Sequence, residues 1–341
     1  MALPPGDTLP NGPLGGRNLY APHQPWFSFP AQRASALPQG NITVRTGLYY
    51  VNEFSTKPFN PSDFESSLDE NGRLSPSDQV ALTALDYEST VWELGMDYQA
   101  LPRLRFSVDW RLHARYGGGL DSFIEWWHKA LGVANAGREY FYHNMSRWDV
   151  ELAGHPNLTG VGNVVASGDL DLRALWTAYT SPSLILAAGG AFKIPLGKRG
   201  SSFSSGRPDL GINGILEWRI SPRWILYSDA GLIIPLGGGG RLMGQFIPSL
   251  EFRASRSISL LLQANIQSSP VVGVEEYLHP IFKRQTLYAM PQTDIKIGLK
   301  GQHGDFGWEF YFEEDPLTWE GPDILFFFGG SYQFSTIPKK F

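Results

Sequence analysis

Residues 104–115 read Leu-Arg-Phe-Ser-Val-Asp-Trp-Arg-Leu-His-Ala-Arg, and the fold can be inferred from this stretch. Apolar and polar side chains alternate along it, with Phe106, Val108 and Trp110 on one parity and Arg105, Asp109 on the other. Successive side chains of a β-strand point to opposite faces, so this period of two predicts a strand. A strand with bulky apolar residues on one face and charges on the other is typical of a wall between lipid and a polar interior.

The same alternation recurs from Asn41 onward. It predicts twelve strands, at 41–53, 84–99, 103–115, 168–180, 183–197, 209–220, 223–236, 242–254, 257–269, 286–300, 306–314 and 323–334. Short connections alternate with long ones, and Trp218 and Trp224 flank a short turn as girdle residues would. We therefore predict an all-β fold, a closed antiparallel transmembrane β-barrel of about 12 strands over residues 41–334. An even number of strands places both termini in the periplasm.

Two irregularities are expected within this plan. In the second strand, Asp86 and Glu88 share one parity while Glu93 and Asp97 share the other, which predicts a β-bulge near residues 90–92. In the long connection 116–167, segments 145–155 and 161–166 alternate enough to form a small hairpin. Residues 237–240 are four glycines without a following helix or a Gly-Lys-Ser/Thr ending, so they indicate a turn rather than a phosphate-binding loop.

The composition of the 341-residue chain excludes several classes of function. The formal net charge is −5, so we predict no nucleic-acid partner, and the absence of cysteine excludes thiol chemistry and disulfides. No run approaches the ~18 apolar residues of a membrane-spanning helix. Met1 leads straight into Ala-Leu-Pro-Pro, without a signal peptide. We interpret the chain as the mature part of a bacterial outer-membrane protein; the alternative is a cytosolic protein.

The two ends of the chain are expected to lie outside the strand pattern. Residues 1–40 are rich in proline, which forbids regular structure, yet they carry Trp26 and Phe27. We predict an N-terminal arm that lies in the periplasm or plugs the lumen, and a C-terminal tail over residues 335–341.

The polar parity of the strands predicts an ionic interior. The predicted lumen-lining residues are Arg105, Asp109, Arg111, His113, Arg115, Asp169, Asp171, Arg173, Glu217, Arg219, Glu251, Arg253 and Glu309. Both signs of charge are present throughout. Such a set either fills a narrow lumen with ion pairs or lines a water-filled pore, and the sequence leaves both possibilities open.

The long connection 116–167 is expected to be an extracellular loop that contains a helix over residues 120–131. Leu120, Ile124, Trp127 and Leu131 recur at helical spacing, and Gly132 can end the helix. On the polar side lie Asp121, Glu125 and His128. Three such groups could ligate a metal, but a solvated face is the favoured interpretation, so no metal is predicted. The helix would lie over the mouth or fold into the lumen. The candidate gate residues are Asp121, Glu125, Trp127 and His128 with Trp26 and Phe27 of the arm.

Residues 117–128, Gly-Gly-Gly-Leu-Asp-Ser-Phe-Ile-Glu-Trp-Trp-His, resemble the central signature of the "domain of unknown function 3187" family of Gram-negative envelope proteins. Residues 11–18, 168–170 and 193–197 look similar to other parts of that family. Residues 330–334, Gly-Ser-Tyr-Gln-Phe, resemble the aromatic assembly signal of outer-membrane barrels, although seven residues follow. The resemblance implies an outer-membrane barrel without an established activity.

Three functions follow from this pattern. The first is a channel or transporter for small solutes, including amphipathic ones, gated by the arm or the loop helix. The second is a non-conducting barrel anchored in the lipopolysaccharide-containing outer membrane, whose loops bind a partner protein. The third is a lipid hydrolase, which is disfavoured because Ser146 lies only three residues from His143 and no Gly-x-Ser-x-Gly elbow is present. We therefore predict no enzyme, no catalytic residues and no cofactor.

Overall fold

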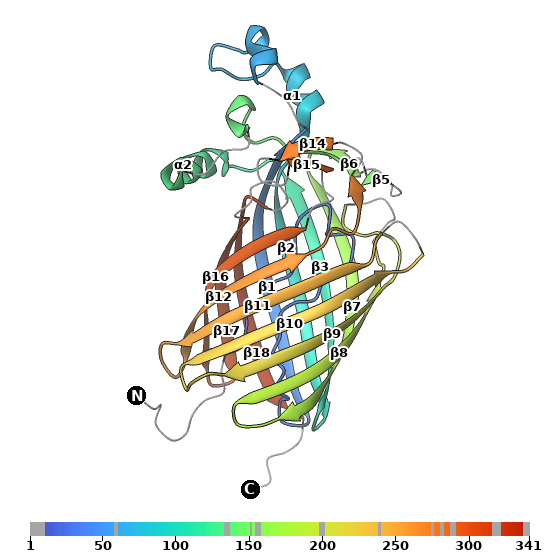
Figure 1. Cartoon of the computed structure of the whole chain (residues 1–341), viewed down its shortest axis with the longest axis vertical. Helices are drawn as coiled ribbons and strands as arrows, with labels where there is room; N and C mark the ends of the chain where they lie inside the picture. The colour runs from blue at the N-terminus through green and yellow to red at the C-terminus, as the bar shows by residue number, and fades with distance from the viewer. Residues whose placement is uncertain are drawn as a thin grey trace.

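The computed structural model describes residues 11–57, 61–132, 137–150, 152–153, 158–197, 202–237, 240–273, 276–279, 283–286, 291–315 and 322–336. Twelve long strands in these ranges form an antiparallel barrel (Figure 1). They are β1 (Asn41–Thr56), β2 (Thr83–Leu101), β3 (Leu104–Tyr116), β7 (Val164–Thr180), β8 (Leu184–Ile194), β9 (Asp209–Arg219), β10 (Trp224–Pro235), β11 (Met243–Arg253), β12 (Ile258–Gln267), β16 (Gln292–His303), β17 (Phe306–Glu314) and β18 (Ile324–Ser335).

The barrel is closed by β1, which pairs with both β18 and β2. Leu48, for example, lies opposite Phe328 on one side and Trp92 on the other. A closed barrel has no free strand edge, so every strand finds hydrogen-bonding partners on both sides. The predicted closed twelve-stranded antiparallel barrel is confirmed.

The smaller elements belong to the long connections, all at one end of the barrel, here called the long-loop end (Figure 1). They are η1 (Pro61–Ser67), α1 (Pro76–Leu82), α2 (Asp121–Leu131), η2 (Arg138–Tyr140), β4 (Arg147–Val150), β5 (Leu152–Ala153), β6 (Leu158–Val161), β13 (Val272–Gly273), β14 (Glu276–His279) and β15 (Lys283–Thr286). The opposite, short-turn end carries the tight connections between consecutive strands. No helix within the described ranges is long and apolar enough to cross a membrane.

Alternate residues of each strand point to the outer and inner faces of the wall, as the sequence predicts. Trp92 and Phe106 point outward, with 42% and 47% of their surfaces exposed, whereas Asp109 is buried inside. Trp218 and Trp224 are exposed on either side of a short turn. An apolar outer face with aromatic residues near the strand ends is what a hydrocarbon layer requires.

The bulge predicted near residues 90–92 is wrong. The register of β2 runs without a shift from Tyr98 to Leu85 against β1, and from Glu88 to Gln99 against β3. Asp86 and Glu88 instead point outward where the long connection covers the barrel: the Glu88 carboxylate accepts the backbone N–H of Leu120 at 2.6 Å. The change in polar parity therefore reflects a protein cover over the outer face, not an extra residue.

The small hairpin in the long connection also differs from the prediction. β4 pairs with β6, with Arg147 opposite Val161, so the second strand of the hairpin is 158–161 rather than 161–166. Residues 164–166 open β7 instead and pair with β3. A barrel strand that extends beyond the membrane keeps its neighbour, because pairing with an existing long strand satisfies more backbone groups than a new hairpin would.

Candidate functional site

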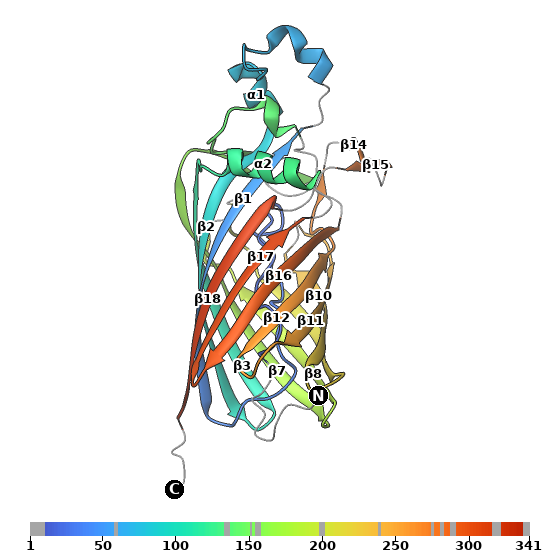
Figure 2. The ribbon, with the colours of Figure 1, turned by 90° about the vertical axis from the view of Figure 1, so that its left-hand side faces the viewer.

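The arm, defined here as residues 11–40, runs through the interior of the barrel (Figure 2). It has no strand or helix of its own, so its backbone N–H groups need partners elsewhere. Polar side chains of the wall supply them. The N–H of Leu14 donates to Gln263 Oε1, Gly15 to Glu309 Oε1, Ala21 to Glu53 Oε1, Phe27 to Asp209 Oδ2 and Phe29 to Gln245 Oε1, all at 2.8–3.0 Å. The interior of the wall is therefore complementary to an extended backbone.

Arg17 is the main charged contact between the arm and the wall. Its guanidinium lies 3.2 Å from Glu93, 2.9 Å from Asp109 and 2.8 Å from Asp171, and its side chain is fully buried. A charge taken out of water is tolerated only where close partners of opposite sign replace the solvent. Sequence reasoning missed Arg17, because nothing in a proline-rich segment indicates which residue will be buried.

The glycine before Arg17 shows how closely the arm approaches the wall. A Cβ built on Gly16 would lie 1.7 Å from the hydroxyl oxygen of Tyr311. Only glycine fits this position, because any side chain would collide with the ring. The pair Gly15-Gly16 in front of an arginine is the one signal in the sequence that could have marked this contact.

Around Arg17, the wall forms a network of ion pairs. Arg45 lies 3.0 Å from Asp97 and 2.8 Å from Asp109, and Arg111 lies 3.1 Å from Asp171. Arg173 also pairs with Asp109. With Arg17, the network joins four guanidinium groups to four carboxylates, those of Glu93, Asp97, Asp109 and Asp171. Its formal charges cancel.

The other predicted lumen residues on β3 and β7 contact the arm or loop residues that enter the lumen, except that Asp169 contacts a side chain of β8. Arg105 donates to Gln32 Oε1 and to the Arg33 carbonyl, both at 3.2 Å. His113 packs beside Phe203, with ring centroids 5.1 Å apart. The remaining contacts are Arg115 with Ser202 and with Gln24 at 3.0 Å, and Asp169 with Lys193 at 3.2 Å. These positions are filled by protein rather than left facing an open bore.

The predicted lumen residues on β9, β11 and β17 also lie on the inner face. Glu217 pairs with Arg33 of the arm at 2.9 Å and with Arg219 at 3.3 Å. Glu251 accepts the N–H of Asn11 at 3.0 Å. Arg253 donates to the Pro222 carbonyl at 3.4 Å, and Glu309 pairs with Lys300 at 2.9 Å. Arm residues Arg17, Gln32 and Arg33 are the partners that the sequence did not reveal.

Trp26 and Phe27, the arm residues of the candidate gate, are buried inside the barrel. They belong to an apolar cluster with Phe29, Ile233 and Met243, and the rings of Phe27 and Phe29 meet edge to face at 4.8 Å. The burial of three aromatic rings within a polar lumen makes an apolar barrier on the side of the long-loop end.

Helix α2 occupies a different place from the expected lid. Figure 2 shows it lying crosswise at the ends of β17 and β18. The Trp127 ring packs edge to face on Phe312 at 6.0 Å, and His128 pairs with Glu314 at 3.5 Å. Phe312 has the parity of the outward-facing residues of β17. The helix therefore packs on the outside of the rim, neither over the mouth nor in the lumen.

The three polar residues of α2 reach three different partners. Asp121 pairs with Arg138, Glu125 with His143 at 2.9 Å, and His128 with Glu314. Helical spacing placed them on one side of the helix, but the side chains diverge. They do not form a common site with Trp26 and Phe27, so the two halves of the candidate gate are separate.

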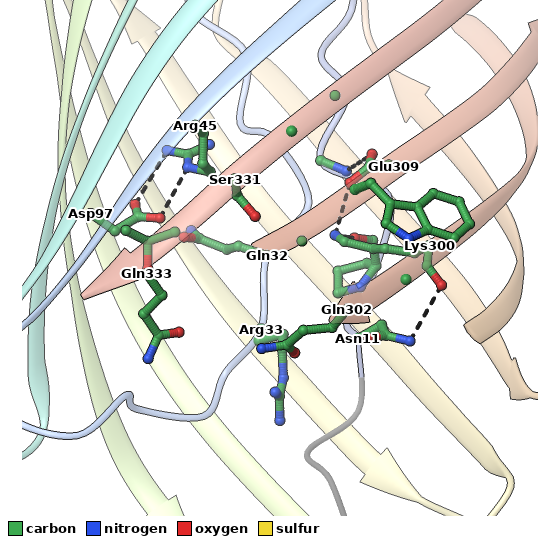
Figure 3. Close-up of a pocket in the computed structure, with 18 of the residues that line it drawn as sticks. Asn11, Gln32, Arg33, Arg45, Asp97, Lys300, Gln302, Glu309, Ser331 and Gln333 are labelled. Carbon is green, nitrogen blue, oxygen red and sulfur yellow. Dashed lines mark hydrogen bonds and ion pairs between the residues drawn. The ribbon is translucent and has the colours of Figure 1, made fainter. Parts of the chain in front are cut away.

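A cavity of about 600 Å³ lies towards the short-turn end, between the wall and two stretches of the arm, residues 11–15 and 30–38. Gln32, Arg45 and Asp97 lie on one side of it, and Lys300 and Glu309 on the other (Figure 3). Apolar surface comes from Pro30 and Phe327 among others. The cavity is large enough for a small organic molecule.

A closed barrel with an apolar, aromatic-rimmed outer face and a charged interior defines an outer-membrane-type β-barrel protein. The chain belongs to the family described as "Protein of unknown function (DUF3187)", whose model matches residues 77–334. No curated protein matches the chain.

Several solved structures are similar to this chain. The COG4313 outer membrane channel from Pseudomonas putida F1 aligns with a TM-score of 0.52 at 12% identity, over 88% of this chain and 98% of that chain. The toluene transporter TodX of Pseudomonas putida aligns at 0.39 and 10% identity, over 94% and 98%. A FadL homologue of Pseudomonas aeruginosa aligns at 0.40 and 7% identity, over 97% and 100%. At 12% identity, the likeness to the COG4313 channel describes the fold alone.

Proposed function

We propose that the protein is an outer-membrane channel for small solutes and that its own arm holds it closed. The observation that carries the proposal is the bonding of the arm: its backbone N–H groups are held by carboxylates and amides of the wall. Ion pairs between strands, such as that of Arg45 with Asp97, fill part of the interior, but they leave carboxylates and amides that accept backbone N–H groups of the arm. Here the wall offers polar groups to a segment that enters from one end.

Displacement of the arm is electrostatically feasible. Wall groups such as Glu309 and Asp209 now accept hydrogen bonds from the arm, and water can replace those donors once the lumen fills. Exposure of a charged surface to water is favourable, whereas exposure of an apolar core to water is not. The open state is therefore a hydrated, charge-lined pore, and the present arrangement is the closed state.

Outer-membrane barrels usually have short turns on the periplasmic side and long loops on the extracellular side. We propose that the short-turn end faces the periplasm and that the arm enters the lumen from that side. The long-loop end would then face the cell surface, with the apolar outer face of the wall against lipid and lipopolysaccharide. The solute class includes amphipathic molecules, because the cavity combines charged groups with Pro30 and Phe327.

Deletion of residues 1–38 tests the proposal by liposome swelling and single-channel recording. We expect the deletion to raise the swelling rate strongly, because it removes the arm from the lumen. Trp127→Ala is the matched control: it loosens α2 on the outer face and should leave conductance unchanged. Heat-modifiable migration in detergent gels checks that each variant forms a barrel. A folded deletion variant that stays sealed would refute the channel.

A partner-binding anchor is the second candidate role. Helix α2 presents Phe123 and Trp126 with 39% and 61% of their surfaces exposed, which is unusual for large aromatic residues outside the lipid-facing wall. A sealed barrel after arm deletion, together with a stoichiometric partner that copurifies and is lost in Trp126→Ala, would establish this role instead.

Lipid hydrolysis is disfavoured by the geometry of the loop. Ser146 donates to the Gly162 carbonyl at 2.9 Å and does not meet His143. His143 does approach Ser122, through Nδ1 at 3.3 Å, while its Nε2 faces both Glu125 and Arg73. The Glu125 carboxylate can only accept, so its shorter contact at 2.9 Å favours the tautomer with the proton on Nε2 and leaves Nδ1 to accept from the Ser122 hydroxyl. The contact between Ser122 and Nδ1 is nevertheless long for a hydroxyl hydrogen bond, and we propose transport rather than catalysis.

A further inference from the structure

Arg105 lies beside the neutral ion-pair network and outside it. The network joins Arg17, Arg45, Arg111 and Arg173 to an equal number of carboxylates. Arg105 makes no ion pair within the described residues. Its Nη2 contacts only two neutral oxygens, and its Nε has no hydrogen-bond acceptor although the residue is 8% exposed. Asp97 acts on Arg105 only from beyond ion-pair distance and already pairs with Arg45, so five guanidinium groups face four carboxylates, an excess of one positive charge.

The side chain of Gln32 marks where a counter-charge would fit. Gln32 Oε1 accepts from Arg105 Nη2 and from Arg173 Nη1, both at 3.2 Å. A single neutral amide oxygen thus lies between two guanidinium groups. An ionised carboxylate adds the attraction of opposite charges to a hydrogen bond from arginine, and it can accept two such bonds side by side. A carboxylate oxygen at this position would bind both arginines better than the amide does.

All three residues line the cavity near the short-turn end, so a solute can reach them. Gln32 belongs to the arm, whereas Arg105 and Arg173 belong to the wall on β3 and β7. Pro30 and Phe327 supply apolar surface in the same cavity. The combination suits a molecule with one anionic group and an apolar body.

We propose that this cavity binds small organic acids, whose carboxylate takes the place of the Gln32 amide oxygen between Arg105 and Arg173. As a statement about the transported solute, this rests on the proposed channel function. Binding displaces an arm side chain from the wall, so the ligand weakens the contact that holds the arm in the lumen.

Calorimetric titration of the full-length protein in detergent tests the proposal with benzoate and with its uncharged analogue benzyl alcohol. We expect the wild type to bind benzoate at least about tenfold more tightly than benzyl alcohol, from charge-assisted hydrogen bonds. Arg105→Gln should abolish this preference by weakening benzoate binding alone. Arg223→Gln is the matched control: it removes the same charge at the same end of the barrel, in a turn that does not line the cavity.

A second variant keeps the test decisive if Arg105→Gln fails to fold. Gln32→Glu retains every arginine and supplies an internal carboxylate, so it should weaken benzoate binding by about tenfold or more and raise the melting temperature. Equal binding of benzoate and benzyl alcohol by the wild type, or unchanged benzoate binding in Gln32→Glu, would overturn the proposal. A protein that binds benzoate but never conducts would refute the channel and leave this site standing.

Discussion

The guanidinium of Arg17 lies 2.9 Å from the carboxylate of Asp109, and neither side chain is exposed to solvent. The two residues are 92 positions apart in the chain. One belongs to the arm and the other to the middle of β3, so this contact fastens the arm to the wall deep inside the barrel. The predictions below concern what holds the arm in place and what holds the outer loop.

Replacement of Arg17 by methionine should release the arm. The change leaves Glu93, Asp109 and Asp171 without the cation that they share, and breaking a buried ion pair costs about 3–5 kcal/mol. We expect a higher single-channel conductance and a higher open probability than in the wild type. Arg207→Met, at the long-loop end, is the control. Unchanged conductance in a folded Arg17→Met barrel would contradict the role of this contact.

A side chain at position 16 should displace the arm by collision. In Gly16→Leu, the new Cβ would overlap the hydroxyl group of Tyr311, which lies 1.7 Å from its position. We expect trypsin to cleave after Arg17 in this variant and not in the wild type, where the side chain is buried. Gly119→Leu is a suitable control because no atom lies within 4 Å of its added Cβ. Continued protection of Arg17 in Gly16→Leu would sink the prediction.

The docking of α2 should depend on pH through His128. Burial disfavours the imidazolium, but the contact with Glu314 outweighs it and raises the pKa of His128 above its usual 6.5. A raised pKa in the docked state means that protonation stabilises docking. The stabilisation is present below pH 6.5 and is lost as the pH rises through the raised pKa. Docking therefore weakens towards alkaline pH.

Trypsin cleavage after the exposed Lys129 reports this change. The ratio of the cleavage rates of wild type and His128→Gln, measured at each pH, cancels the pH dependence of the protease itself. We expect the wild type to be cleaved more slowly than His128→Gln near about pH 6 and at a similar rate near about pH 8.5. A ratio that does not change with pH would show that His128 does not titrate in this contact.

Arg138 should hold the outer loop to the barrel. Its guanidinium pairs with Asp121 at the start of α2 and with Asp323 before β18, and it donates to Asn52 of β1 at 2.9 Å. Arg138→Met leaves two buried carboxylates unpaired, at a cost of about 3–5 kcal/mol. Faster proteolysis within residues 117–144, with the barrel itself intact, is the expected result.

Arg138→Lys is the informative companion to this variant. Lysine keeps the charge but cannot spread several donors in one plane over three acceptors, so it should restore protection only in part. Full rescue by lysine would mean that charge alone fastens the loop. Because these contacts lie on the outer face, neither variant should change conductance.

The strands could be predicted because their evidence is local. Side chains of a β-strand alternate by backbone geometry, so Phe106 and Asp109 reveal their faces without knowledge of any other part of the chain. At Asp86 and Glu88 the alternation of faces holds, because both side chains point outward, but the inference that outward-facing residues must be apolar was wrong. There a remote segment, residues 117–121, covers the wall and makes polar outward positions acceptable.

The helix at 121–131 could be predicted for the same local reason, but its position could not. Helical spacing identifies one apolar side of α2, yet it does not say which surface that side will cover. Trp127 finds Phe312 and Arg138 finds Asp323, partners nearly two hundred residues away. A lid over the mouth was expected because the sequence of a loop does not indicate which strand the loop will pack on.

Side-chain alternation is thus enough to predict the wall, its apolar outer face and its charged inner face. The face on which a residue lies depends only on its position along its own strand. Whether that charged interior is open or filled depends on pairs such as Arg17 with Asp109 and Gln32 with Arg105. These contacts join an irregular, proline-rich segment to distant strands. Only the folded chain brings such groups within hydrogen-bonding distance, since closure of the barrel creates the enclosed space that the arm then enters.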